Sequence, residues 1–377
     1  MNIAIVHEWF VNYAGAERCI ESFLNIWPDA DIFSLVDFLD PDERTQILKG
    51  RHAHTSYIQK LPFAEKSHRK YLPLFPGAIE KFDLSDYDLI ISSSHSVAKG
   101  VKTKKDQLHI CYCHTPMRYA WDEAELYLEE ANLNTGIKGF AARKIIEYLR
   151  RWDKKSAENV TWFIANSNYI AKKIKRIYNR DSDVIYPPVD TKKFPVSVNK
   201  ENFYVTASRL VPYKRVDIIV DAFTKMPDKK LIVIGSGPEK EKLKMKAGAN
   251  IEFAGFLDAD SMVKCMQEAL AFVFAAEEDF GIVPLEALSC GTPVIALNKG
   301  GTAETIRDGI TGIHFNEQTA EDLIDGVTRF EEKHDAFNPN KLHEYAAQFD
   351  RSVFEDRMKK YVSDKFSFFY NEGKKQI

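Results

Sequence analysis

The sequence predicts an α/β protein with two domains, each built on a doubly wound parallel sheet. Short apolar runs that indicate buried strands alternate with segments of helical periodicity along most of the chain. The chain has 377 residues, which is too many for one hydrophobic core of ordinary size. The stretch 186–202 contains three prolines and few helix formers, so we take it as the connection between the domains. We therefore expect one domain over residues 1–185 and a second over 186–354.

The composition is that of a soluble globular protein, with 45% hydrophobic and 28% charged residues. A net charge of −3 argues against general nucleic-acid binding. The five cysteines are scattered and mostly lie in apolar runs, which is typical of reduced cysteines in a cytoplasmic protein. The first residues lead directly into a strand rather than a signal peptide, and no apolar run approaches the ~20 residues that span a bilayer. We expect a cytoplasmic protein whose contact with a membrane, if any, is peripheral.

Buried strands are predicted in the first domain at five apolar runs: NIAIVHEW, DADIFSLVDF, DLIISSS, HICYC and TWFIA. The first is followed by a helix with apolar residues at helical spacing, and the fifth by the helix NYIAKKIKRIY. The segment 139–160 is a strongly amphipathic helix, and packing of its apolar face on the sheet of this domain accounts for it without a membrane.

The segment 55–82 is less regular, and its basic residues alternate with aromatic and aliphatic ones. Such a cluster is typical of a surface that docks on an anionic membrane. A solvated charged face is the alternative, and the residues leave both open.

Strands of the second domain are predicted at NFYVTA, LIVI, IEFAG, LAFVFAA and TPVIAL, with helices between them and at 319–333 and 354–370. LIVI leads into Gly235-Ser236-Gly237-Pro238, which is not the G-x-G-x-x-G of a dinucleotide site, so a nicotinamide dehydrogenase is disfavoured. Asp86-Tyr87-Asp88 spells D-x-D but directly precedes an apolar strand, so we expect it to be structural. We expect neither a metal nor another cofactor.

The most informative stretch is 277–297, a strand–loop–helix–strand unit whose loop lies at the carboxyl end of a parallel sheet. Glu278 precedes the helix, with Pro284 expected at its first position and Glu286 in its first turn. The N–H groups near Gly281, Ile282 and Val283 favour an anion, and the carboxylates suit sugar hydroxyls. A nucleotide-sugar matches both features. Alternatively, Glu286 complements the helix dipole and Glu278 is solvated.

Glu278 and Glu286, seven residues apart in E-D-F-G-I-V-P-L-E, resemble the E-x7-E signature of family 4 retaining glycosyltransferases. Further similar segments are A-G-A-E near residue 15, H-T-P-M-R-Y near 114 and S-R-L-V-P-Y-K near 209, so the resemblance covers most of the chain. It implies the GT-B fold, in which two Rossmann-like domains face a cleft. It also implies that the last helix, about 355–377, packs back on the first domain.

The resemblance implies the following roles on the donor side. Glu286 would hold the nucleotide ribose and Glu278 the donor sugar. Arg209 and Lys214 would bind the diphosphate, whose charge grows as the glycosidic bond breaks and must be stabilised by fixed cations. Further expected donor contacts come from the second-domain residues Phe280, Gly281, Ile282, Val283 and Phe256, and from Gly15 of the first domain.

On the acceptor side, the resemblance implies that His114 meets the transferred sugar. It follows a buried strand in a proline-stiffened loop, where function is common, although a lone histidine is often structural. Arg118, Tyr119, Asp122 and Ala16 would line the acceptor.

The implied reaction is transfer of a hexose from a nucleotide-sugar to a sugar hydroxyl, with retention at the anomeric carbon. The segments HEWF, HTPMRYAWD and SRLVPYKRVD most resemble bacterial surface-polysaccharide mannosyltransferases, which favours GDP-mannose and a lipid-linked glycan acceptor. A UDP-hexose donor is the first alternative, and a non-catalytic sugar-nucleotide-binding subunit is the second. An epimerase and a glycan phosphorylase are weaker rivals.

Overall fold

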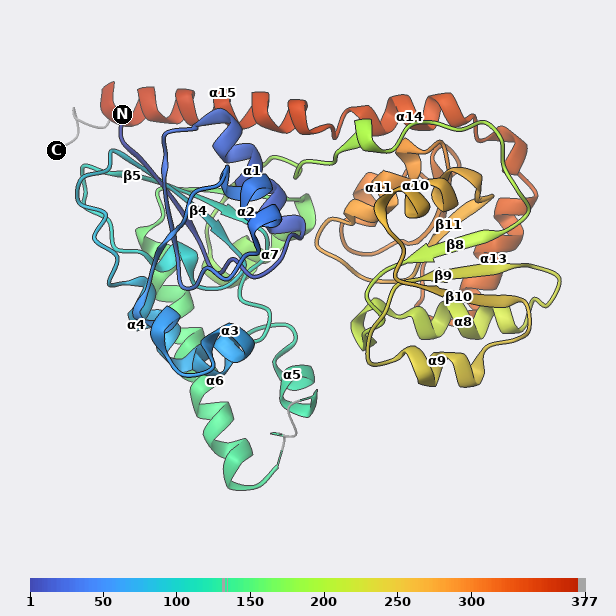
Figure 1. The fold of residues 1–377 in the computed structure, drawn as a ribbon, viewed down its shortest axis with the longest axis horizontal. Coiled ribbons are helices and arrows are strands. Elements are labelled where there is room, and N and C mark those ends of the chain that lie inside the picture. The colour runs from blue at the N-terminus through green and yellow to red at the C-terminus, as the bar shows by residue number, and fades with distance from the viewer. Residues whose placement is uncertain (131–132, 134, 372–377) are drawn as a thin grey trace. The chain divides into compact units, whose positions relative to one another are not determined.

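A computed structural model describes residues 1–130, 133 and 135–371 of the chain. These residues form two compact units (Figure 1). Unit 1 comprises Met1–Pro188 and the C-terminal helix from Phe354 onward, and unit 2 comprises Val189–Val353. Within the described ranges, no helix has both the length and the apolar character needed to pass through a membrane.

Unit 1 is built on a sheet that has seven parallel strands among the described residues, in the order β3-β2-β1-β4-β5-β6-β7. The strands are β1 Ile3–His7, β2 Asp31–Ser34, β3 His54–Thr55, β4 Leu89–Ser94, β5 Leu108–Cys113, β6 Trp162–Ala165 and β7 Ser182–Val184. The helices are α1 Gly15–Ile26, α2 Pro41–Leu48, α3 Ala64–Ser67, α4 Phe75–Ile79, α5 Ala124–Glu130, α6 Gly136–Ser156, α7 Asn168–Tyr178 and α15 Arg351–Asn371.

Unit 2 repeats this architecture with six parallel strands in the part of the chain that is described, in the order β10-β9-β8-β11-β12-β13. The strands are β8 Tyr204–Ala207, β9 Leu231–Ile234, β10 Ile251–Gly255, β11 Ala271–Phe274, β12 Val294–Leu297 and β13 Gly312–Phe315. The helices are α8 Val216–Thr224, α9 Lys240–Lys246, α10 Ala259–Glu268, α11 Ile282–Ser289, α12 Thr302–Thr305, α13 Ala320–Glu331 and α14 Pro339–Ala347.

The strand order places a topological switch point in each sheet. From β1 the chain proceeds outward through β2 and β3, then returns to β4 on the other side of β1; β8 and β11 are related in the same way. In doubly wound sheets, ligands bind outside the carboxyl ends of the strands at this point. The strand order therefore marks the carboxyl ends of β1 and β4 in unit 1, and those of β8 and β11 in unit 2.

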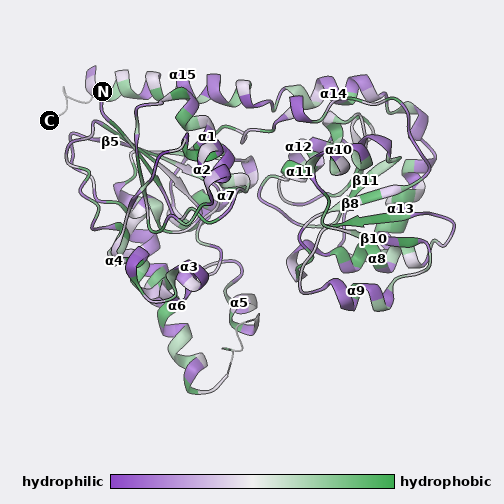
Figure 2. Cartoon of the chain, viewed as in Figure 1, coloured by the Kyte–Doolittle hydropathy of each residue, from purple (hydrophilic) through white to green (hydrophobic). Residues whose placement is uncertain are grey.

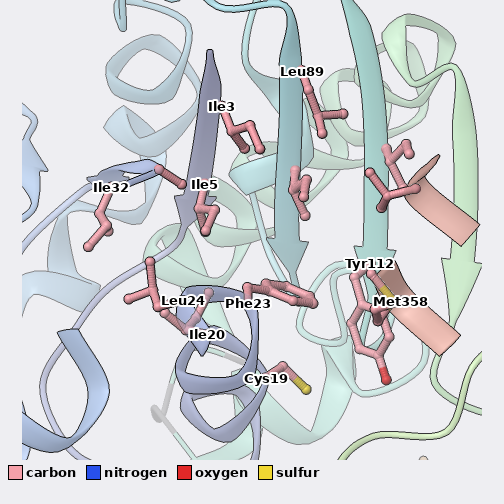
Figure 3. Close-up of a cluster of buried hydrophobic side chains, with 14 of the residues drawn as sticks. Ile3, Ile5, Cys19, Ile20, Phe23, Leu24, Ile32, Leu89, Tyr112 and Met358 are labelled. Carbon is pink, nitrogen blue, oxygen red and sulfur yellow. The ribbon is translucent and has the colours of Figure 1, made fainter. Parts of the chain in front are cut away.

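One face of the unit 1 sheet is covered by α1 and α15. Ile20, Phe23 and Leu24 of α1 pack on apolar residues of β1 and β5, and Met358 of α15 joins the same cluster (Figure 3). Phe354 of α15 stacks on Phe23 with 5.8 Å between the ring centroids. The predicted C-terminal helix extended to residue 377, and residues 372–377 lie outside the described residues.

The prediction that the apolar face of α6 is buried on the sheet was only partly correct. Leu149 is fully buried and Trp152 is half-buried, but Ile137 and Phe140 near the start of the helix are 89% and 65% exposed. The N-terminal part of α6 extends beyond the sheet of unit 1 (Figure 1), and apolar residues continue along it (Figure 2). Helical periodicity identifies an apolar face, but it does not tell how far along the helix that face is covered.

Candidate active site

The loops that follow β8 and β11 bring three predicted donor-site residues to the switch point of unit 2. Arg209 follows β8, Lys214 ends a short 3₁₀ turn (Pro212–Lys214) before α8, and Glu278 follows β11. Lys214 Nζ forms an ion pair with Glu278 Oε1, and the two side chains are 18% and 19% exposed. Lys214 and Glu278 are 64 positions apart in the sequence, and the fold brings their side chains into contact.

Tyr213 connects the two cations of this group, and sequence analysis did not identify it. Arg209 Nη2 donates a hydrogen bond to Tyr213 Oη at 2.5 Å. The ammonium of Lys214 lies 5.4 Å from the centroid of the Tyr213 ring, within the range of a cation–π interaction. Tyr213 lies between Arg209 and Lys214 in the sequence motif, but tyrosine is not a residue type that signals phosphate binding.

The start of α11 differs from the prediction. We expected Pro284 at the first helical position and Glu286 in the first turn, but α11 begins at Ile282, so Pro284 is its third residue and Glu286 its fifth. The reason is Gly281, which caps the helix in the left-handed region at φ +86° and lets the chain turn sharply into it. A proline in the first turn costs no intrahelical hydrogen bond. The N–H groups of Ile282 and Val283 belong to this first turn, at the positive end of the helix dipole.

The other predicted donor residues of unit 2 differ in exposure. The side chain of Glu286 is buried, and Phe280 is also buried, with its ring 6.1 Å from that of Phe349. Phe256 follows β10 and is 87% exposed. β10 is two strands away from β8 in the sheet, and donor contact by Phe256 stays a prediction.

A pair of glycines after β12 supports the loop that carries Glu278. The N–H group of Gly301 donates to the carbonyl oxygen of Glu278 at 2.7 Å. A Cβ atom on Gly301 would overlap the backbone of Phe280, and one on Gly300 would overlap that of Glu278. Only glycine permits this close approach. The pair Gly300-Gly301 is visible in the sequence, but the residues that it contacts are not.

In unit 1, His114 immediately follows β5, and its Nε2 lies 2.8 Å from Ser93 Oγ at the end of β4. Its backbone N–H donates to the carbonyl oxygen of Ser94 at 2.8 Å, which aligns the two strand ends. Burial lowers the pKa of His114 well below its usual value, and the neighbouring His95, His7 and Arg118 lower it further. The imidazole is therefore neutral near pH 7, with one N–H donor and one acceptor nitrogen.

A buried network of charged residues lies at the same edge of the sheet, and sequence analysis missed it. Glu8 is fully buried, and its Oε1 accepts hydrogen bonds from the hydroxyl of Ser94 and from three backbone N–H groups, those of His95, Ser96 and Ala98. Burial alone would raise the pKa of Glu8, but His95, His7 and these N–H groups lower it. The ionised Glu8 carboxylate therefore holds the loop after β4 in place.

His7 forms a second part of this network. Its Nε2 lies 3.3 Å from Glu17 Oε1, and its Nδ1 lies 3.3 Å from the carbonyl oxygen of Ser93. Burial alone would lower the pKa of His7, but the hydrogen bond to Glu17 and the charges of Glu17 and Glu8 raise it. Glu17 also accepts from the N–H of Ala14, the N-cap residue of α1, at 3.1 Å.

The predicted acceptor-side residues are spread over the loop after β5 and the start of α1. Gly15 and Ala16 are the first two residues of α1, and both are partly exposed. The phenol oxygen of Tyr119 is hydrogen-bonded to Ser96 Oγ, and Arg118 Nη1 lies 3.9 Å from Glu123. Acceptor contact by Ala16, Arg118 and Tyr119 stays a prediction, as does donor contact by Gly15.

Asp122 faces α7. Its carboxylate pairs with Lys173 at 3.1 Å and with Arg176 at 2.5 Å. Burial alone would raise the pKa of Asp122, but the hydrogen bonds from these two residues lower it. These ion pairs join the loop after β5 to α7, and acceptor contact by Asp122 stays a prediction.

The two halves of the chain match two glycosyltransferase families. Residues 189–349 match the family described as Glycosyl transferases group 1, and residues 15–193 match Glycosyltransferase Family 4. Together the two matches cover residues 15–349. The chain is a glycosyltransferase of the group 1 and family 4 type. The predicted fold class is confirmed, because the two Rossmann-like parallel-sheet units are those of the GT-B fold.

Individual relatives match over shorter stretches. The sulfoquinovosyl transferase SQD2 of Arabidopsis thaliana is 29% identical over 160 residues, which cover 40% of this chain and 31% of that protein. A D-inositol 3-phosphate glycosyltransferase of Mycobacterium sp. (strain KMS) is 29% identical over 175 residues, 40% of each chain. The glycosyltransferase thus spans less than half the length of these curated relatives.

Solved structures match over the whole chain and show the fold. Anabaena HepE in complex with UDP has 19% identity and a TM-score of 0.70, covering 97% of this chain and 100% of that one. The lipopolysaccharide outer core galactosyltransferase WaaB has 18% identity and a TM-score of 0.65, with the same coverage.

Proposed function

We propose that this glycosyltransferase moves a hexose from a nucleotide-sugar to a hydroxyl of a glycan acceptor, with retention at the anomeric carbon and without a metal ion. The donor that we favour is GDP-mannose, and the acceptor is a lipid-linked glycan used in surface-polysaccharide synthesis. The observation that carries the proposal is the group at the unit 2 switch point. There Lys214 pairs with Glu278, Arg209 is hydrogen-bonded to Tyr213 on the loop that carries Lys214, and α11 begins four residues after Glu278.

This group has the charges that a sugar diphosphonucleoside requires. Arg209, Lys214 and the N–H groups of Ile282 and Val283 supply positive charge and hydrogen-bond donors for a diphosphate. Glu278 supplies a carboxylate acceptor for the hydroxyls of the hexose, and Glu286 one for the ribose. When the bond between the anomeric carbon and the diphosphate breaks, the leaving oxygen gains charge that the two cations stabilise.

In unit 1, we propose that the neutral imidazole of His114 hydrogen-bonds the transferred hexose, held in position by Ser93. The acceptor would be contacted by Arg118, Tyr119, Asp122 and Ala16, and Gly15 would lie beside the donor.

Retention is proposed to occur by front-face attack. The acceptor oxygen bonds to the anomeric carbon on the side from which the diphosphate leaves, and the acceptor proton passes to the leaving phosphate oxygen. Glu278 then forms no covalent bond to the sugar. Mass spectrometry of peptides from the enzyme after reaction with a slow donor tests this step, and a hexosyl group on Glu278 would refute it.

A UDP-hexose is the second candidate donor, and one observation favours it. The structures of Anabaena HepE contain UDP, and UDP with glucose. The segments HEWF, HTPMRYAWD and SRLVPYKRVD support GDP-mannose instead, because they resemble bacterial mannosyltransferases. The comparison of both donors in one assay separates these candidates.

The experiment that tests the proposal is a donor screen followed by a transfer assay. GDP, UDP and ADP and their sugars are compared by thermal shift, and the stabilising donors are then tested with a glycan acceptor in the presence of EDTA. We expect stabilisation by one nucleotide class, and a product whose anomeric configuration equals that of the donor. Transfer that EDTA abolishes would contradict metal independence.

Lys214→Met and its matched control complete the test. Removal of one charge-stabilising donor typically costs about 10²–10³ in kcat, so a loss of that size is expected for Lys214→Met. Lys225→Met is the control, because Lys225 ends the adjoining helix α8 and pairs with Glu321. Equal activity of the two variants would contradict the proposed site. If Glu278→Ala left glycan synthesis intact, a non-catalytic binding subunit would be the better description.

We also propose that the reaction takes place in the cytoplasm, at the inner face of the cell membrane where a lipid-linked acceptor is found. All five cysteines are free thiols, which supports a reducing compartment. Fractionation of cells that produce the protein tests this assignment.

A further inference from the structure

The part of α6 that extends beyond the sheet presents apolar side chains to solvent. Ile137, Phe140 and Tyr148 are large and exposed, and Ile145 is exposed at the edge of the same region. Ile137, Phe140, Ala141 and Tyr148 are separated by three, one and seven residues, so they share one face of the helix. Exposed large apolar residues grouped on one helix face indicate a binding surface rather than ordinary scatter.

This face continues onto the irregular segment that contains α3 and α4. Trp152 Nε1 of α6 donates a hydrogen bond to Glu80 Oε1 at the end of this segment, at 2.6 Å. Tyr57, near the start of the segment, donates a hydrogen bond to the carbonyl oxygen of Leu74 at 3.4 Å, and Tyr57 and Leu74 are both exposed. Phe63, in the same segment, is 81% exposed.

The charges around the face are mostly positive. α6, all of whose residues the structure describes, contains seven basic and two acidic residues. One of the two acids, Asp153, is buried and paired with Lys99, and the other, Glu147, is paired with Lys144 and Arg151. The basic residues of α6 are Lys138, Arg143, Lys144, Arg150, Arg151, Lys154 and Lys155. The neighbouring segment 57–81 adds the bases Lys60, Lys66, Arg69, Lys70 and Lys81 and the acids Glu65 and Glu80, and α5 adds Glu125, Glu129 and Glu130, of which Glu125 pairs with Arg143. These three segments together have twelve basic and seven acidic residues, whereas the whole chain has a net charge of −3.

We propose that this face, which we call the α6 face and define by Ile137, Phe140, Ile145, Tyr148 and the basic residues of α6, docks on an anionic lipid bilayer. Apolar side chains of an interfacial helix enter the boundary between headgroups and acyl chains, while the surrounding cations contact the anionic headgroups. An apolar ring and a cation lie together on this face, since the Lys144 ammonium is 5.8 Å from the centroid of the Phe140 ring. The proposal names the membrane-contacting element and goes beyond the transfer reaction itself.

Sedimentation with vesicles tests the α6 face. The full chain is mixed with vesicles of equal parts phosphatidylglycerol and phosphatidylcholine, and with vesicles of phosphatidylcholine alone. We expect binding to the first and little to the second, with binding weakened by salt. Ile137→Ser/Phe140→Ser should lower partitioning about tenfold or more, because two exposed apolar side chains no longer enter the bilayer. Lys138→Gln/Arg143→Gln/Lys144→Gln should lower it about a hundredfold, since each cation contributes about fivefold.

Matched controls come from exposed positions of unit 2. Val198→Ser/Met245→Ser removes two exposed apolar side chains, and Lys244→Gln/Lys246→Gln removes cations of α9. Both controls should bind vesicles as the natural protein does. Binding of the α6 variants at the natural level would overturn the proposal. The proposal would also be overturned if the natural protein were a dimer and the α6 variants were monomers that bound vesicles as the natural protein does.

Transfer to a soluble acceptor separates this proposal from the proposed function. The α6 variants should retain that activity at the natural level, because none of the substituted residues belongs to the candidate active site. Loss of vesicle binding with retained transfer supports docking through α6. Normal vesicle binding by a protein that transfers no sugar refutes the proposed function only.

Discussion

Asp153 of α6 is the residue whose substitution should affect the stability of unit 1 most clearly. It is fully buried, pairs with the equally buried ammonium of Lys99, and accepts hydrogen bonds from Trp121 Nε1 at 2.7 Å and Tyr178 Oη at 2.8 Å. In Asp153→Asn, the amide oxygen can still accept a hydrogen bond, but the Lys99 ammonium is left buried without a negative partner. Breaking a buried ion pair in this way costs about 3–5 kcal/mol. For a domain of this size, that corresponds to a fall in Tm of roughly 6–20 °C.

The assay is thermal unfolding followed by circular dichroism and by tryptophan fluorescence, since Trp121 contacts the substituted side chain. Glu147→Gln is the control, because Glu147 lies on the same helix and forms only exposed ion pairs, so its Tm should not change measurably. Lys99→Met/Asp153→Asn should be more stable than Asp153→Asn alone, because the double variant contains no unpaired ammonium. If Asp153→Asn and Glu147→Gln shift the Tm equally, the reasoning is refuted.

Three further predictions concern pH, backbone packing and the imidazole at the end of β5. Burial lowers the pKa of His109 to about 4 from 6.5, so the unfolded chain binds more protons between these values and stability should fall as pH falls from 6.5 to 4. His109→Gln should make the free energy of unfolding fall less steeply with falling pH, whereas His52→Gln, at an exposed histidine, should leave that slope unchanged. The free energy is measured by urea titration at each pH, and equal slopes for the two variants would count against the assignment. Gly301→Ala should lower kcat at least tenfold by displacing the site loop, whereas Gly77→Ala, with open space around its Cβ, should not; unchanged kinetics would show that the loop tolerates the shift. Ser93→Ala should lower kcat about tenfold with little change in Tm, since it removes one hydrogen bond; an unaltered pH–rate profile and kcat would argue against a positioning role.

The fold class could be predicted from the sequence because each buried parallel strand is a short apolar run and each helix has its own period. The donor motif could be predicted in part for a related reason. Carboxylates and cations that directly follow such strands gather at one sheet edge, as Lys214 and Glu278 do.

Other features had no local signal in the sequence. Glu8 adjoins a buried strand, and only the fold shows that three N–H groups from a loop about 90 residues later converge on its carboxylate. The approach of Gly301 to Phe280 is a contact between two separate loops. The start of α11 depended on the left-handed conformation of Gly281, which determines where the helix begins. The exposure of α6 depended on where the sheet ends beneath it.

The most direct test of the proposed site is a crystal structure of the protein with the nucleoside diphosphate that stabilises it most. We predict diphosphate oxygens within about 2.7–3.2 Å of Arg209, Lys214 and the first-turn N–H groups of α11. A diphosphate bound at any other place, or held through a divalent ion by carboxylates, would contradict the account.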